Sequence, residues 1–272
     1  MLVYLLFITA ILIIALLIFT PLWRSRRRQR VAARPFPESW HQLLEQHWRL
    51  YAVLPEDVRD QLQRQLRVMM AETEFYGCND LVVTEKMRVL VLAQASLLYD
   101  SAIHHQQTDF PTVLLYPDAF VREGAMMDEL GLVAEERHIL LGESWEQGKV
   151  ILSWADIERN LAQSQSHHNL VIHEYAHQID GYDGAMNGTP PVAGHPKFQT
   201  WPVVMQDAYN DLCHRVDAGD ISFDPYATTN PAEFFAVVSE YFFMQPQVLI
   251  ERYPDVYRLL SAFYRRDPLA WT

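Results

Sequence analysis

The first 23 residues, "MLVYLLFITAILIIALLIFTPLW", carry no charged side chain, and the first charge is Arg24. A helix needs about 20 apolar residues to cross the hydrocarbon layer of a membrane. The apolar core of a cleaved signal peptide is shorter, about 7–15 residues, and it follows a basic leader and precedes a small-residue cleavage site. None of these features is found here. A buried helix of a globular domain fits less well still, because no face of this segment is polar. The sequence therefore predicts a transmembrane anchor over residues 1–23.

Six arginines and no acidic residue lie in residues 24–34, directly after the predicted anchor. Basic residues beside a span stay on the cytoplasmic side, so we expect a single-pass protein of the inner (cytoplasmic) membrane with its body in the cytoplasm. The arginines can also contact anionic lipid headgroups. Residues 24–38 contain two prolines, Pro35 and Pro37, and are predicted to be a basic, proline-containing linker. Residues 39–272 are then left for one folded domain.

The charge of this domain excludes one class of partner. The net charge of the chain is −12, and removing the six arginines of residues 24–34 leaves −18 for the rest. Such an acidic body repels phosphates, so nucleic acid is not expected as a main partner. The chain has only two cysteines, Cys78 and Cys213, which argues against a disulfide scaffold.

The pattern of the domain is mostly helical and predicts an α+β fold with a small sheet. Two short β-rich runs, residues 110–117 and 149–154, are bounded by turn residues. Residues 181–196 contain four glycines and three prolines and are expected to form an irregular loop. Helices are expected over 39–54, 55–77, 84–102, 165–180, 200–219, 230–246, 247–254 and 255–268.

One of these helices contains the motif His-Glu-x-x-His at residues 173–177, in "NLVIHEYAHQID". Positions four apart share one face of a helix, so His173 and His177 can converge on one ion, whereas Glu174 points about 100° away. This arrangement is typical of a catalytic zinc site in which the glutamate activates a water molecule. We therefore expect one Zn²⁺ per chain, bound by His173 and His177, with Glu174 as general base.

A catalytic zinc site also needs a third protein ligand. His167 and His168 lie on the same predicted helix but only five or six residues before His173, which places them poorly, and we expect them on the polar surface. His195, in the glycine-rich loop, and His214, in a mostly polar helix, are further candidates.

Two glutamates are better candidates for the third ligand. Glu233 and Glu240 are the only charges in the apolar run "NPAEFFAVVSEYFF", and they lie two turns apart on one face of its predicted helix. A buried carboxylate is costly unless it is paired or bound to a metal. One of the two could bind the ion while the other orients a histidine ligand. The alternative is that they meet solvent or an arginine such as Arg252.

Several blocks resemble a known family. "NLVIHEYAHQID", "SWEQGKVILSW", "DPYATTNPAEFFAVVSEYFF" and "FYRRDPL" are similar to blocks of the Mlc titration factor A family, also called the DgsA anti-repressor family. The similarity runs from about residue 40 to the C-terminus. Members are bacterial zinc metallopeptidases, and their core resembles the protease domain of anthrax lethal factor. The resemblance therefore implies a helix-rich, zincin-like domain.

The resemblance also implies roles for single residues. Glu233 matches the third zinc ligand, which leaves Glu240 as a candidate for orienting a ligand. Tyr226 matches a tyrosine near the metal, whose phenol could donate a hydrogen bond to the oxyanion; the alternative is a packing tyrosine. Asp180, three residues after His177, either orients that histidine or accepts hydrogen bonds from backbone amides.

The predicted function is zinc-dependent hydrolysis of peptide bonds at the cytoplasmic face of the membrane, and the family's described activity is aminopeptidase-like. "KVILSW" is the strand best placed to pair with a substrate, and the loop 181–196 is expected to border the cleft. The alternative is a regulatory protein that sequesters a transcriptional repressor such as Mlc. Hydrolysis of a non-peptide ester or amide would use the same residues.

Overall fold

The computed structural model describes residues 2–99, 110–118, 148–163, 166–191 and 196–271. The α-helices in these ranges are α1 (Leu2–Ala32), α2 (Glu38–His47), α3 (Arg49–Val53), α4 (Glu56–Glu72), α5 (Glu85–Ser96), α7 (Trp154–Ala162), α8 (Leu170–Asp180), α9 (Trp201–Asp217), α10 (Pro231–Met244), α11 (Pro246–Arg252) and α12 (Pro254–Tyr264). The short 3-10 turns are Gly181–Asp183, Pro196–Phe198, Pro225–Thr228 and Pro268–Ala270.

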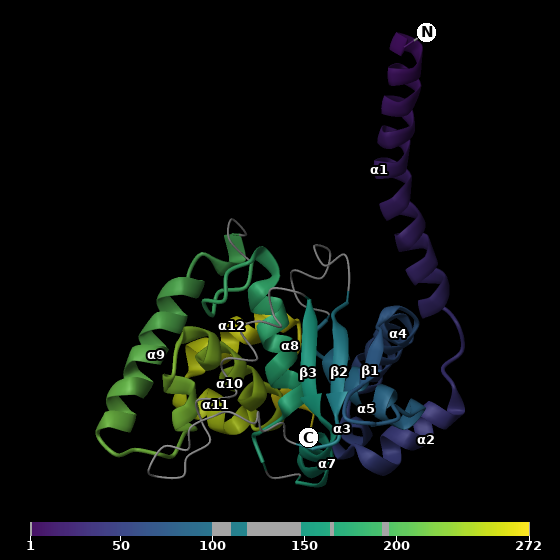
Figure 1. The fold of residues 1–272 in the computed structure, drawn as a ribbon. Coiled ribbons are helices and arrows are strands. Elements are labelled where there is room, and N and C mark those ends of the chain that lie inside the picture. The colour runs from purple at the N-terminus through teal and green to yellow at the C-terminus, as the bar shows by residue number, and fades with distance from the viewer. Residues whose placement is uncertain (1, 100–109, 119–147, 164–165, 192–195, 272) are drawn as a thin grey trace.

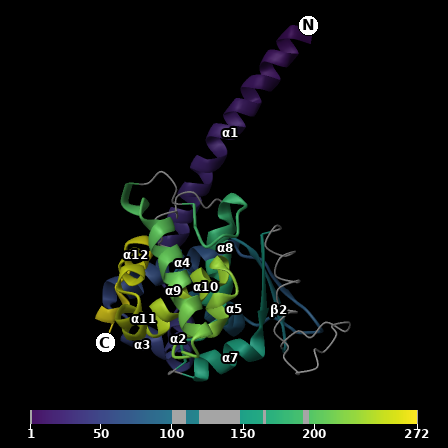
Figure 2. The ribbon, with the colours of Figure 1, turned by 90° about the vertical axis from the view of Figure 1, so that its left-hand side faces the viewer.

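The strands of the described residues form one parallel sheet in the order β1-β2-β3. They are β1 (Phe75–Gly77), β2 (Thr112–Tyr116) and β3 (Lys149–Ser153). Val113 of β2 lies opposite Val150 of β3, and both side chains are buried because alternate residues of a strand point to one face. Figure 2 shows the sheet at one edge of the body, with the helices gathered on one side of it.

Helix α8 lies in the middle of the helical layer. It packs against β3 and α5 on one side and against α10 on the other (Figure 1). Helices α9, α11 and α12 pack around α10, where aromatic rings such as Trp201, Phe235 and Phe263 fill the core. Both α8 and α10 are therefore buried over most of their length, and polar side chains on their facing sides are held inside the protein.

Helix α1 extends beyond the predicted anchor. It includes Pro21 and continues to Ala32, so the first part of the segment predicted as a linker is helical. The end of α1 is fixed to α4: Arg28 lies 2.8 Å from Glu72, and Arg67 donates to the carbonyl of Ala32 at 2.6 Å. Among the described residues, no helix is long and apolar enough to span a membrane. The anchor predicted for residues 1–23 is therefore not confirmed.

The α+β class and the small sheet are confirmed, as are the two predicted strands at β2 and β3. Strand β1 was not expected, because Gly77 was interpreted as the end of a long helix; α4 instead ends at Glu72. Helix α7 was not expected either. It begins directly after β3, where the Ser153 side chain caps it by accepting from the amide of Asp156.

Candidate metal centre

The position of the motif helix α8 is fixed at its first turn. The Asn169 side chain accepts a hydrogen bond from the amide of Ile172 at 3.1 Å, which is a regular N-cap. The Asn160 side chain of α7 accepts from the amide of Leu170 at 3.0 Å. These contacts satisfy amides that a helix leaves without an intrahelical partner, so α8 can begin inside the protein.

Helix α10 begins with the capping pattern that the sequence predicts. Asn230 accepts from the amide of Glu233 at 3.0 Å, and Pro231 occupies the first turn. Glu233 therefore lies in the first turn of α10, and the residue is 1% exposed.

Helices α8 and α10 run antiparallel, as their contacts show. Glu233, near the start of α10, meets His177 in the second half of α8, whereas Glu240, two turns later, contacts the backbone amide of Asn169 at the start of α8. The separation of seven positions between the two glutamates corresponds to about 10 Å along the helix. Two carboxylates from one face of α10 therefore contact α8 at different points along its length, one near its start and one in its second half.

Three side-chain atoms converge between these helices. The Nε2 atoms of His173 and His177 are 3.1 Å apart. Oε2 of Glu233 lies 3.1 Å from Nε2 of His173 and 3.3 Å from Nε2 of His177. All three residues are buried, and the group has the composition and compactness of a metal site.

This triangle fits a tetrahedral ion. Ligand atoms about 2.0–2.1 Å from a zinc ion lie roughly 3.3 Å from one another in a tetrahedron, which is close to the three spacings observed. The Nδ1 atom of His173 lies 2.8 Å from Oε1 of Glu240 and donates its proton there, so Nε2 is the ring nitrogen left to bind an ion, which would replace the proton that Nε2 carries in the metal-free protein. The three residues therefore suit a divalent cation in both spacing and donor chemistry.

Glu240 lies behind His173 and holds it. Besides His173, this carboxylate accepts from the amide of Asn169 and lies 3.0 Å from Nδ1 of His168. A hydrogen bond to the second ring nitrogen fixes both the tautomer and the orientation of a histidine ligand. Glu240 is 1% exposed, so this contact is shielded from water.

The local charges shift the pKa values of these groups. Burial alone would raise the pKa of Glu240, but His168 and His173 lower it to about 2. The pKa of Glu233 is lowered in the same way by His173 and His177, against the effect of burial. Burial lowers the pKa of His177 to about 4, whereas the two carboxylates raise the pKa of His173 well above its usual value despite its burial. Both glutamates are therefore charged at neutral pH, and His177 is neutral.

Glu174 and Tyr226 lie next to this cluster. Glu174 follows His173 on α8 and is 3% exposed, and its negative charge contributes to the raised pKa of His173. Tyr226 is half-buried, and its ring centroid lies 6.0 Å from that of His173. The structure thus brings five predicted site residues together, namely His173, Glu174, His177, Tyr226 and Glu233.

Asp180 is buried at the end of α8. Its Oδ2 accepts from the amide of Gly188 at 2.8 Å, which is the second of the two roles considered for it. Gly188 in turn accepts from Nε1 of Trp201 at 3.1 Å through its carbonyl. Asp180 therefore fixes the first half of the glycine-rich loop.

The other predicted candidates lie elsewhere. His195 lies outside the described residues, and His214 is exposed on α9. Arg252 lies 2.9 Å from Asp220, so it is not the partner of either buried glutamate. His168, expected on the polar surface, is 41% exposed but contacts Glu240. Its position directly before the helix cap was the only signal for this contact.

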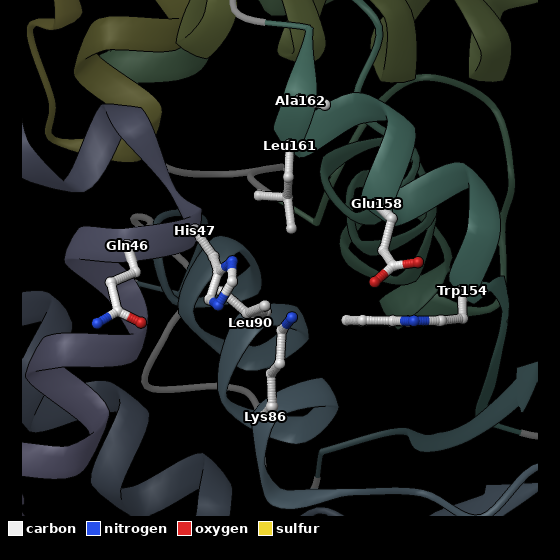
Figure 3. Close-up of a pocket in the computed structure, with 8 residues that line it drawn as sticks. All are labelled: Gln46, His47, Lys86, Leu90, Trp154, Glu158, Leu161 and Ala162. Carbon is white, nitrogen blue, oxygen red and sulfur yellow. The ribbon is translucent and has the colours of Figure 1, made fainter.

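A separate cavity of about 250 Å³ lies between α2, α5 and α7 (Figure 3). Lys86 of α5 and Glu158 of α7 point toward it, and Trp154 forms one wall. None of its lining residues belongs to the cluster of His173, His177 and Glu233. It is therefore distinct from the candidate metal centre.

A buried helix with His-Glu-x-x-His, completed by a glutamate from an antiparallel helix, defines a metallopeptidase-like domain. Comparison with known proteins gives its family. The family model described as glucose-regulated metallo-peptidase M90 matches residues 22–265, and the chain belongs to this family.

Relatives cover nearly the whole chain. Mlc titration factor A of Yersinia pestis (strain Pestoides F) is 34% identical over 257 residues, which is 92% of this chain and 90% of that protein. Mlc titration factor A of Yersinia pseudotuberculosis (strain YPIII) shows the same values. The uncharacterized protein slr2042 of Synechocystis is 35% identical over 251 residues, covering 92% of this chain and 91% of its own. The family resemblance noted in the sequence is thereby confirmed.

Proposed function

We propose that the protein is a zinc-dependent peptidase in which His173, His177 and Glu233 bind the ion. The observation that carries this proposal is the buried triangle of two imidazole nitrogens and one carboxylate oxygen, with spacings of 3.1, 3.1 and 3.3 Å. Membership of a metallopeptidase family supports it. When bound in such a site, zinc acidifies a water molecule and polarises a carbonyl group.

The protein's own side chains then have separate tasks. Glu174 accepts the proton of the attacking water and passes it to the leaving amine. The Tyr226 phenol donates a hydrogen bond to the carbonyl oxygen of the scissile bond as negative charge develops there. Glu240 keeps Nε2 of His173 directed at the centre by accepting from Nδ1.

Strand β3 is our candidate for holding the substrate. Among the described residues it lies at the edge of the sheet, and Gln178 of α8 donates to its Lys149 carbonyl at 3.2 Å. An extended peptide can add to such an edge through main-chain hydrogen bonds. We propose peptides as substrates, with an aminopeptidase-like preference, and the loop 181–196 as one border of the cleft.

The deciding experiment replaces Glu174 with Gln. Zinc content, measured by elemental analysis, should stay near one ion per chain, because Glu174 is not a ligand. Hydrolysis of a peptide library should fall by about 10²–10⁴-fold, the usual contribution of a general base. Glu158→Gln, an exposed change on the neighbouring helix α7, is the matched control and should leave the rate unchanged. Full activity in Glu174→Gln would end the general-base assignment.

A second candidate function is the sequestration of a transcriptional repressor. The name of the Yersinia relatives, Mlc titration factor A, favours it. We propose that binding of such a repressor is separable from hydrolysis. Glu174→Gln should then still bind purified Mlc in a pull-down assay, and failure of both variant and wild-type protein to bind it would remove this candidate.

We further propose that residues 1–23 anchor the domain to the inner membrane with the body in the cytoplasm. The uncharged N-terminal segment and the six arginines after it support this orientation. A reporter fused after Thr272 should behave as cytoplasmic and sediment with membranes. Periplasmic behaviour would contradict the orientation, and a fully soluble fusion would contradict the anchor.

A further inference from the structure

Two consecutive histidines, His167 and His168, lie directly before the N-cap of α8 and contact two different acids. His168 contacts Glu240, the carboxylate behind His173. His167 contacts Asp224, which lies 57 residues later in the chain, just before the 3-10 turn that carries Tyr226. The contact of His167 has no part in the proposed metal binding and therefore calls for a separate explanation.

The His167 ring is held on two sides. Its Nε2 lies 3.0 Å from Oδ2 of Asp224. Its face stacks on the ring of Tyr241, with centroids 4.3 Å apart and planes 6° from parallel. Tyr241 stacks in turn on Phe223, the residue before Asp224, at 4.0 Å. The imidazole thus lies with one face covered by Tyr241 and with its Nε2 facing the carboxylate.

Asp224 also contacts the turn that carries Tyr226. Its other oxygen, Oδ1, accepts from the backbone amide of Tyr226 at 2.9 Å and caps the turn Pro225–Thr228. One carboxylate therefore binds the segment before α8 with one oxygen and the Tyr226 backbone with the other. Burial would raise the pKa of Asp224, but His167 and the Tyr226 amide lower it, so the carboxylate is ionised and both bonds are charge-assisted.

Tyr226 is half-buried and is carried by a single 3-10 turn, which also packs against α9 and α10. Its ring lies beside His173, which belongs to α8. The contacts of His167 with Asp224, and of Asp224 with the Tyr226 amide, thus connect Tyr226 to the start of α8 independently of the metal ligands. A displacement of about 1 Å at a reacting group can cost about 100-fold in rate, so this restraint matters for catalysis.

We propose that His167 is a positioning residue that, through Asp224, holds the Tyr226 phenol in its place beside His173. This inference rests on the proposed function, in which Tyr226 stabilises the oxyanion. His168 has a different role, because its partner Glu240 orients the metal ligand His173 and not the turn of Tyr226.

The test uses His167→Phe in the full-length protein. Phenylalanine keeps an aromatic ring to stack on Tyr241 but cannot bond to Asp224. We expect kcat for a peptide substrate to fall about tenfold, with KM and zinc content nearly unchanged. His167→Gln retains a donor and should recover part of the loss. In a Tyr226→Phe background, the same His167→Phe change should lower kcat by less than about twofold, because the phenol it positions is gone.

His168→Phe is the matched control. It should weaken zinc binding, and its effect on kcat should persist in the Tyr226→Phe background. An equal loss of kcat from His167→Phe in both backgrounds would show a merely structural role and overturn the proposal.

A second measurement does not depend on catalysis. With 3-fluorotyrosine placed at position 226, His167→Phe should shift or broaden the ¹⁹F resonance, whereas His168→Phe should change it much less. An unchanged resonance in His167→Phe would refute the positioning role. If the resonance changes but Tyr226→Phe retains full kcat, the positioning stands and the oxyanion role of Tyr226 fails.

Discussion

His173 and Glu240 form a 2.8 Å hydrogen bond between two buried side chains, on the side of the imidazole opposite to Glu233. The two glutamates of α10 thus have different tasks although they share one helix face. Glu233 lies among the ligand atoms, whereas Glu240 lies behind them and contacts the ring of one ligand, His173. Their different positions lead to different expectations for metal affinity.

Removal of each carboxylate should therefore lower zinc binding by different amounts. Glu233→Ala removes a ligand and should leave little zinc on the purified protein. Glu240→Ala should weaken zinc affinity by about 10–100-fold, the usual effect of losing a residue that orients a ligand. Competition with a chelator of known affinity measures both. The reverse order of losses would mean that Glu240, and not Glu233, is the third ligand.

Removal of the metal should destabilise the fold. His173, His177 and Glu233 converge in the core, and an ion that binds only the folded protein stabilises it by about 4 kcal/mol when its concentration is 1,000 times its Kd. Dialysis against a chelator should thus lower Tm by several degrees, and added zinc should restore it. Glu233→Ala should show no zinc-dependent shift in Tm. An unchanged Tm in the wild-type protein after verified zinc loss would contradict a stabilising metal.

The centre of this site could be predicted from the sequence, because its signals are local. His173 and His177 are four residues apart on a helix, and Asn230 with Pro231 marks the start of α10. Spacing alone left Glu233 and Glu240 open as ligands, since two residues seven apart share a helix face. The antiparallel packing of α8 and α10 separates their positions, and the family resemblance had already implied the same choice.

Other features depend on tertiary contacts that no local pattern encodes. His167 and His168 were interpreted as polar surface, but each contacts an acid from more than 50 residues later in the chain. Strand β1 has three residues and no apolar alternation, and it forms because its backbone pairs with β2. Helix α7 begins directly after β3, with no turn residues between them, so the sequence carries no signal that separates the strand from the helix.

Asp180 should make stability depend on pH. Burial raises the pKa of this carboxyl to about 7, although the amide of Gly188 opposes the shift. In the unfolded chain an aspartate has a pKa of about 3.9. Between these values the folded protein binds a proton that the unfolded chain has lost, so this residue's contribution to the free energy of unfolding decreases as pH rises from about 4 to 7.

The variant Asp180→Asn should remove this dependence while retaining an acceptor for the Gly188 amide. Urea unfolding at pH 5 and pH 8 would measure it in both proteins. The wild-type protein should lose more stability between the two values than the variant, with an upper bound of about 1.4 kcal/mol per unit of pKa shift. Equal losses in the two proteins would show that Asp180 ionises normally.

Gly188 should tolerate no side chain, and the reason lies at the start of α10. Its φ is +75°, and a Cβ placed on it would lie 2.3 Å from the carbonyl oxygen of Pro231, two residues before Glu233. Gly184, in the same loop, has φ +87° but has nothing within 4 Å of an added Cβ. Alanine would introduce backbone strain at either position, but only at Gly188 would its Cβ also collide with another part of the protein.

Gly184→Ala should therefore cost only about 1 kcal/mol of stability, the strain of a left-handed alanine. Gly188→Ala should cost roughly 3 kcal/mol, because the first turn of α10 must also move away. That movement displaces Glu233 relative to His173 and His177, so zinc affinity should fall in Gly188→Ala and stay unchanged in Gly184→Ala. Urea unfolding and chelator competition measure the two effects. Equal stability losses, with zinc affinity intact in both variants, would show that the contact between Gly188 and Pro231 does not support the metal centre.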